Sequence, residues 1–175
     1  SDNIEVLSHV PLGVPRSVAD VELEQEVERP FAYVARAQLG PEGAMGMDVV
    51  DLSEPRDAEV IYRWRIENPA LHEGGGGLDT KYFKWDGRYY VVQSFQFGQG
   101  GPDSDLGAIV FDVTGLPDTS RVEEVARIRA PETPGGFHNI FVYKHSNDRV
   151  YLFSTVSGPH ANVYDLGSVV EEGGA

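Results

Sequence analysis

Short runs of apolar residues alternate with polar residues along most of the chain, and the alternation has a period of two. This pattern is typical of half-buried β-strands, whose successive side chains point to opposite faces of a sheet. Gly, Pro, Asn and Asp separate the runs, and these residues favour turns. No long stretch has the 3.6-residue period of an amphipathic helix. The sequence therefore predicts an all-β protein.

The runs repeat in groups of four. Each group predicts a four-stranded antiparallel unit with short turns between neighbouring strands. The expected strands are residues 18–27, 31–38, 46–52 and 58–66 in a first unit (18–66), and residues 78–84, 88–97, 106–113 and 121–129 in a second unit (78–129). A partial third unit, residues 137–166, has three apolar runs, separated at residues 144–148 and 157–159. The Asp86-Gly87 pair in the second unit is a strong signal for a β-hairpin.

Equivalent polar residues recur in the three units. The start of the first strand holds Asp20, Asp79 and Asn139, and the end of the third strand holds Asp51, Asp112 and Asp165. The carboxylate of a strand-end Asp can accept a hydrogen bond from the backbone of the following turn. A self-similar block of roughly 55–60 residues with four short strands is typical of a β-propeller blade. The predicted fold is a single domain, residues 1–175, that forms a β-propeller-like array of about three blades.

The number of blades predicts that this array is incomplete by itself. Residues 4–10 alternate like a strand, and we expect them to form an outer strand that completes the partial third unit. Three blades are fewer than the roughly four to eight of most propellers. The alternatives are that the array belongs to a longer propeller or that a partner completes it. If residues 4–10 do not fill the gap, the strand around Tyr164 has an open edge for another chain to cover.

Several segments resemble a known family. The pairs FAYVAR and GMDVVDLSEP, RYYVVQSF and GAIVFDVTGLPD, and VYLFST and NVYDL are similar to the repeats of LVIVD-repeat proteins. The resemblance covers most of residues 18–166. It implies a β-propeller in an exported or envelope protein of bacteria, and hence a periplasmic or extracellular location. It implies no catalytic residues.

Composition and charge exclude some partners. The net charge of −14 leaves no basic face for the phosphates of nucleic acids or for an anionic membrane surface. No window is long and apolar enough for a transmembrane segment, and the N-terminus carries no targeting signal. The absence of Cys excludes disulfides, thiolate metal sites and cysteine nucleophiles.

The longest Gly-rich loops are expected on one face of the array. In a meander, loops between second and third strands lie on the same face as the connections between units. The candidate ligand or partner residues on this face are His72, Glu73, Asp103, Asp105, His138 and His160. A His/carboxylate site for a divalent metal is geometrically allowed there. The alternative is that the His rings cap loop backbones and fill the rim.

Catalytic motifs are missing from the sequence. It contains no GxSxG, no HExxH and no EF-hand continuation after Asp103-Ser-Asp105. We therefore expect no cofactor and a non-enzymatic scaffold that binds other proteins. A sharper form of this hypothesis is a membrane-extrinsic accessory subunit that stabilises a respiratory or photosynthetic envelope complex. The alternative is a propeller that binds a metal or a small ligand at the Gly-rich loop face, with hydrolysis as one possible activity.

Overall fold

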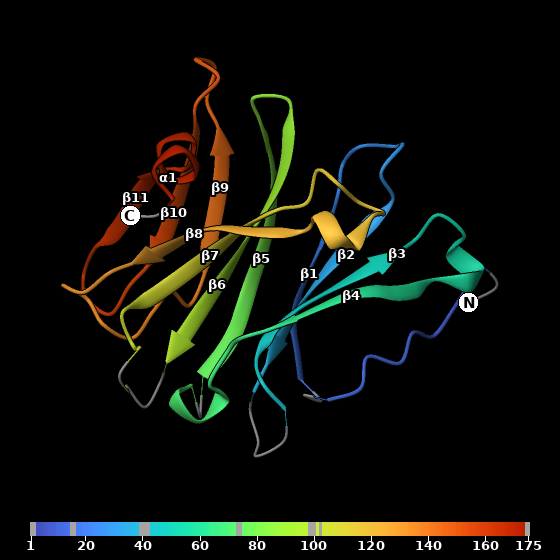
Figure 1. Cartoon of the computed structure of the whole chain (residues 1–175), viewed down its shortest axis with the longest axis horizontal. Helices are drawn as coiled ribbons and strands as arrows, with labels where there is room; N and C mark the ends of the chain where they lie inside the picture. The colour runs from blue at the N-terminus through green and yellow to red at the C-terminus, as the bar shows by residue number, and fades with distance from the viewer. Residues whose placement is uncertain are drawn as a thin grey trace.

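Strands dominate the computed structural model of the chain (Figure 1), which describes residues 3–14, 17–38, 43–72, 75–97, 101 and 103–173. The strands are β1 (Ser17–Leu23), β2 (Phe31–Ala37), β3 (Gly46–Asp51), β4 (Glu59–Arg65), β5 (Gly75–Trp85), β6 (Arg88–Phe97), β7 (Leu106–Asp112), β8 (Glu123–Arg129), β9 (Ile140–Lys144), β10 (Val150–Thr155) and β11 (Ala161–Asp165). Short 3-10 turns lie at η1 (Pro55–Asp57), η2 (Pro69–Leu71) and η3 (Thr119–Arg121), and one helix, α1 (Leu166–Glu172), follows the last strand. The prediction of an all-β fold is confirmed.

Within each of three groups of consecutive strands, every strand pairs antiparallel with its neighbours in the chain. Strands β1–β4 form one meander and β5–β8 a second, and the pair Ala37–Gly76 joins them into one curled eight-stranded sheet, a half-barrel. Strands β9–β11 form a separate three-stranded sheet. We call these three groups the first, second and third units. Their strands lie close to the ranges expected from the alternation of apolar and polar residues.

The turn chemistry follows the sequence. Asp86 and Gly87 both have positive φ, 47° and 72°, as a two-residue type I′ hairpin turn requires. The strand-end aspartates accept the expected backbone hydrogen bonds: Asp51 from Ser53 N at 2.8 Å, Asp112 from Thr114 N at 2.9 Å and Asp165 from Gly167 N at 3.1 Å. These bonds fix where each third strand ends.

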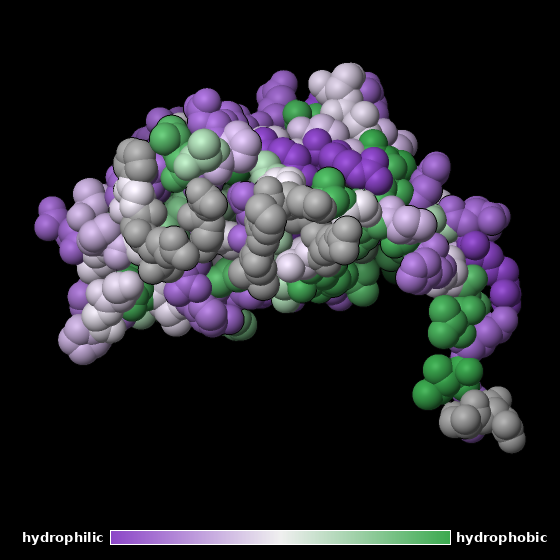
Figure 2. All heavy atoms as spheres, turned by 90° about the horizontal axis from the view of Figure 1, so that it is seen from below, coloured by the Kyte–Doolittle hydropathy of each residue, from purple (hydrophilic) through white to green (hydrophobic). Residues whose placement is uncertain are grey.

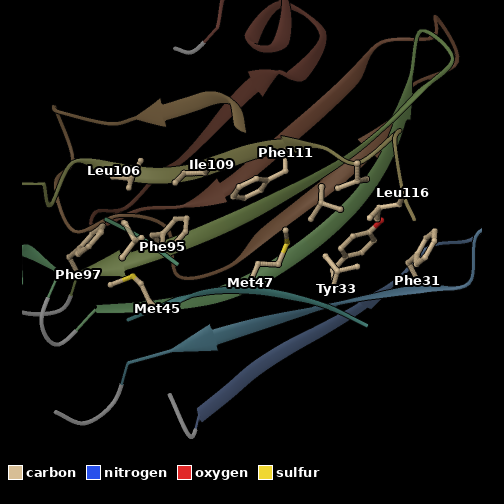
Figure 3. Packing of buried hydrophobic residues seen from close by; sticks show 14 residues of the cluster. Phe31, Tyr33, Met45, Met47, Phe95, Phe97, Leu106, Ile109, Phe111 and Leu116 are labelled. Carbon is tan, nitrogen blue, oxygen red and sulfur yellow. The ribbon is translucent and has the colours of Figure 1, made fainter. Parts of the chain in front are cut away.

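Each unit has two faces, and the units stack by placing one face on the next. The forward face of the first unit, with Phe31, Tyr33, Met47 and Val49, packs on the rear face of the second, with Val91, Phe95, Ile109 and Phe111. Figure 3 labels Phe31, Tyr33 and Met47 of the first unit and Phe95, Ile109 and Phe111 of the second, which meet between the two units. The forward face of the second unit, with Phe83, Tyr90, Val92 and Val110, packs in turn on the rear face of the third, with Ile140, Val150 and Leu152. The core therefore lies between the units.

Two local features differ from expectation. Residues 4–10 form no strand and pair with none of the described strands. Val10 and Leu12 instead pack on the rear face of the first unit, against Val34 and Val50 among others, and the residues before them form an arm that projects from the body in Figure 2. The second difference is α1, a helix that the strand pattern did not predict. Asp165 caps it by accepting hydrogen bonds from Gly167 N and Ser168 N.

Candidate functional site

The loop face brings His72 and Asp103 into direct contact. His72 follows η2 and is only 2% exposed. Its Nδ1 lies 3.1 Å from the carbonyl oxygen of Asn68, and its Nε2 lies 2.9 Å from Asp103 Oδ2. A carbonyl oxygen can only accept, so Nδ1 donates in the first of these bonds. The ring of Phe97 lies against the imidazole, with 5.6 Å between the ring centroids.

An arginine closes this cluster from the other side. Arg129 Nη1 lies 2.6 Å from Asp103 Oδ1 and 2.7 Å from Asp105 Oδ1. Burial of the Asp103 carboxyl raises its pKa, but the hydrogen bonds from His72 and Arg129 outweigh burial and hold this pKa below its usual value. The ionised carboxylate accepts from both neighbours. The cluster therefore ties the loop before β5 and the loop before β7 to β8, and both ring nitrogens of His72 are engaged within the protein.

The other candidate residues of this face lie outside the cluster. Glu73 falls outside the described residues. His138 is exposed and its Nδ1 lies 2.7 Å from Gln96 Oε1. His160 is exposed beside Gly158. In the described part of the chain, no group of three or more His, Asp and Glu residues is arranged to hold a metal ion.

A pocket of about 500 Å³ lies at the opposite end of the units, next to the hairpin turns. It is lined by Trp85, Asp86, Lys144, Asp148 and Glu171. Lys144 and Asp148 pair across it at 3.5 Å, and the Asp148 side chain is almost fully exposed. Because the pocket is wide and polar, it has no enclosed position for a reacting group.

The third unit exposes an apolar sheet face that the sequence analysis did not single out. In the register of β9–β11, Phe153 lies opposite both Phe141 and Val163, and Tyr151 lies opposite Tyr143. Opposed residues of paired strands share a face of the sheet. We call these five residues the outer face. They form the forward face of the third unit, and Phe141, the most exposed of them, has 62% of its surface accessible.

The register shows that the outer face is equivalent to two faces that are buried. The residue opposite the strand-end Asp is Phe31 in the first unit, Tyr90 in the second and Tyr151 in the third. Counting from these residues, the equivalent positions are Tyr33, Val92 and Phe153 on the second strands, and Val49, Val110 and Val163 on the third strands. The four residues of the first two units are 0% exposed, whereas Phe153 is 40% and Val163 is 56% exposed. On its second and third strands, the third unit therefore presents to solvent the face that its two predecessors bury under the next unit.

A second open apolar row lies at the other end of the stack. Val21 pairs with Val34 and Leu23 with Ala32, which places both on the rear face of the first unit. Val21 is 52% and Leu23 47% exposed. The part of this face on β2 and β3 is covered by residues 10–13 of the same chain. There Arg36, which also pairs with the buried Asp48, donates to the carbonyl oxygens of Leu12 and Gly13.

Two apolar runs in the sequence indicate the outer face. Residues 140–143 (IFVY) and 150–153 (VYLF) are apolar at every position rather than at every second one. Strands of this kind are typical of sheets buried on both faces. The rear positions Ile140, Val150 and Leu152 are buried against the second unit, so the remaining positions predict a second covering layer.

Comparisons of the chain with protein-family models, with curated proteins and with solved structures gave no match. Among the described residues, no helix has the length and apolar character needed to cross a membrane.

Proposed function

We propose that the three units are blades of a β-propeller-type array. The support is a hydrogen bond that occurs twice between successive units. Asp20 Oδ2 accepts from the backbone N–H of Thr80 at 3.1 Å, and Asp79 Oδ2 accepts from the backbone N–H of Ile140 at 2.8 Å. The two bonds join residues 60 and 61 positions apart, so each first strand holds the first strand of the next unit in the same way. A radial array of blades around one axis has this arrangement.

In this proposal the array is a non-enzymatic scaffold that acts by binding protein. The observation that carries it is the outer face, because Phe153 and Val163 are exposed where their equivalents in the first two units are buried under the next unit, and Phe141 beside them is exposed as well. Monomeric proteins seldom expose a contiguous apolar patch of more than a few hundred Å², and larger patches are typical of interaction sites. The polar cluster of the loop face supports the same function, since His72 and Asp103 bind each other rather than pointing into a cleft.

The setting of this scaffold is proposed from the resemblance to LVIVD-repeat proteins. On that basis the protein is exported to the bacterial periplasm or the cell surface. There it serves as a membrane-extrinsic accessory subunit of a larger envelope complex, such as a respiratory or photosynthetic one.

A dye that fluoresces on exposed apolar surface tests whether the outer face is open. At low micromolar concentration, the isolated chain should bind 8-anilinonaphthalene-1-sulfonate, and Phe153→Asp should reduce the binding without loss of cooperative thermal unfolding. The matched control is Val27→Asp, because Val27 is 98% exposed and lies in a turn of the first unit, away from the outer face. A cooperatively folded monomer that binds no dye would contradict the proposal.

A further inference from the structure

Resting on this proposed function, we propose that the partner of the outer face is a second copy of the chain. In this dimer the third unit of each copy packs on the first unit of the other. The two chains close a ring of six units about a twofold axis, and the N-terminal arm of each chain pairs with the open edge of β11 in its partner.

The contact is the one that the chain already makes twice within itself. The forward face of the first unit covers the rear face of the second, and the forward face of the second covers the rear face of the third. A third contact of this type joins the outer face to a rear face. The chain's own first unit has such a face, with the open row of Val21 and Leu23. The two open apolar surfaces are therefore one forward face and one rear face, the two kinds of face that pack on each other within the chain.

Ring closure at two copies follows from the number of units. A head-to-tail contact makes a closed ring only if the rotation between copies completes a full turn. Each chain has three units, so two chains provide six, within the four to eight blades of known propellers. Two identical contacts then form together, and neither copy keeps an open apolar face.

The arm has the features of a donated strand. Ile4 and Val6 are more than 80% exposed and alternate with polar residues, although they pair with no strand in their own chain. In the described structure β11 pairs only with β10, so the position of a fourth strand in the third unit is open. An unpaired edge binds an extended segment through backbone hydrogen bonds. In the ring, the arm of one copy starts beside the third unit of the other, which places donor and edge side by side.

Residues 10–13 leave their own first unit when the arm crosses. In the single chain their carbonyl oxygens accept hydrogen bonds from Arg36, and Val10 and Leu12 cover Val34 and Val50. The partner's third unit replaces this apolar cover. The exchange gives up the two hydrogen bonds from Arg36 to Leu12 and Gly13, replaces one apolar cover by another and adds burial of the outer face, which is the thermodynamic gain of the dimer.

The net charge of the chain and the size of the contacts determine how strongly two copies should associate. Each copy carries a net charge of −14, so the two copies repel each other over a distance that salt shortens. The five residues of the outer face are uncharged, and the charges of Arg149 and Asp165 in the same unit neutralise each other in an ion pair of 2.5 Å. Four aromatic side chains of roughly 150–250 Å² each, about half exposed, offer on the order of 400 Å² per contact. Two such contacts predict a dimer. Because salt screens the repulsion between the copies, the dimer dissociation constant should fall as the salt concentration rises.

Sedimentation velocity over a concentration series tests the ring. The wild-type chain should form dimers, with stronger association in about 0.5 M salt than in dilute buffer. Phe153→Asp removes the outer face and Val21→Asp removes the row on β1, and each should raise the dimer dissociation constant roughly 30-fold or more. Deletion of residues 1–10 should also weaken the dimer. Val27→Asp should leave the dissociation constant unchanged, because Val27 lies on neither surface.

The outcomes separate this inference from the proposed function. A dimer that Val21→Asp does not weaken would mean that two outer faces pack on each other, and would overturn the ring. Monomers at every concentration, or oligomers larger than two, would also overturn it. In either case dye binding to the outer face still decides whether that face is open for another protein. Near-ultraviolet circular dichroism checks the fold of each variant, and Leu23→Lys replaces Val21→Asp if the latter fails to fold.

Discussion

Replacing Asp79 with alanine tests the bond that joins the second and third units. The Asp79 carboxylate accepts from the backbone N–H of Ile140 at 2.8 Å and from Asn139 Nδ2 at 3.3 Å. The backbone of Asp79 has its own partners, Ser94 and Gln93, so the substitution removes only the bonds to the third unit. The N–H of the buried Ile140 is then left without its charged acceptor.

A hydrogen bond to a charged group contributes about 1.5–3 kcal/mol to stability. We therefore expect Asp79→Ala to lower the free energy of unfolding in urea by about 1.5–3 kcal/mol. For a chain of this length the midpoint of thermal unfolding should fall by roughly 3–12 °C. Asp79→Asn keeps an oxygen acceptor without its charge and should cost less than Asp79→Ala.

The control is Asp57→Ala, which removes an exposed carboxylate from η1 within the first unit. It should change the free energy of unfolding by less than about 0.5 kcal/mol. If Asp79→Ala were as stable as Asp57→Ala, the hydrogen bond between units would not hold the stack together.

Three further outcomes are expected. A Cβ at position 107 would lie 2.3 Å from Phe137 Cζ, so Gly107→Ala should destabilise the chain by about 1–3 kcal/mol in urea, and by less in a Phe137→Leu background. The pKa of Asp103 is below its unfolded value of 3.8, so its stabilising effect is complete above that pH and is lost as the pH falls through the lower folded value. The difference in unfolding free energy between wild type and Asp103→Asn should therefore shrink below about pH 4, and an equal difference at pH 3 and pH 7 would contradict this. A scaffold without a metal site should purify without stoichiometric metal, and His138→Ala and His160→Ala should each unfold within about 0.5 kcal/mol of wild type; bound metal lost in both variants would instead favour the ligand-binding alternative.

Local chemistry made the strands and turns predictable. The Asp86-Gly87 pair specifies its turn because both residues take positive φ easily, and this is independent of the rest of the chain. Asp51 and Asp112 end their strands by binding backbone two residues further on, which is also a local effect. Such features can be identified from sequence alone because all their partners lie within a few residues.

Features that depend on distant contacts were harder to predict. Residues 4–10 alternate like a strand, but a strand forms only by pairing with an edge, and these residues pair with none of the described strands. The helix α1 has seven residues, too few for a clear helical period, and Asp165 could begin a turn or cap a helix equally well.

The candidate sites also have some features that the local sequence predicts and others that depend on distant contacts. The position of His72 near Asp103 follows from the meander, since both loops lie on one side of it. That the two side chains bind each other and not a ligand depends on the placement of Arg129, which no spacing indicates. The apolar character of Phe141 and Phe153 is visible in the sequence, but their exposure depends on which sheet covers them.

Hydroxyl-radical footprinting with mass spectrometry tests most directly whether the outer face is the open end of a stack of sheets. In dilute protein, Phe141, Tyr143 and Phe153 should be oxidised readily. Tyr33, which is equivalent to Phe153, and the buried Phe31 and Tyr90, which are equivalent to Tyr151, should be protected. At concentrations where the chain associates, oxidation of the outer face should fall and that of the exposed Val27 should not change. Equal oxidation of Phe153 and Tyr33 in dilute protein would show that the third unit is covered like the others, and would contradict the account.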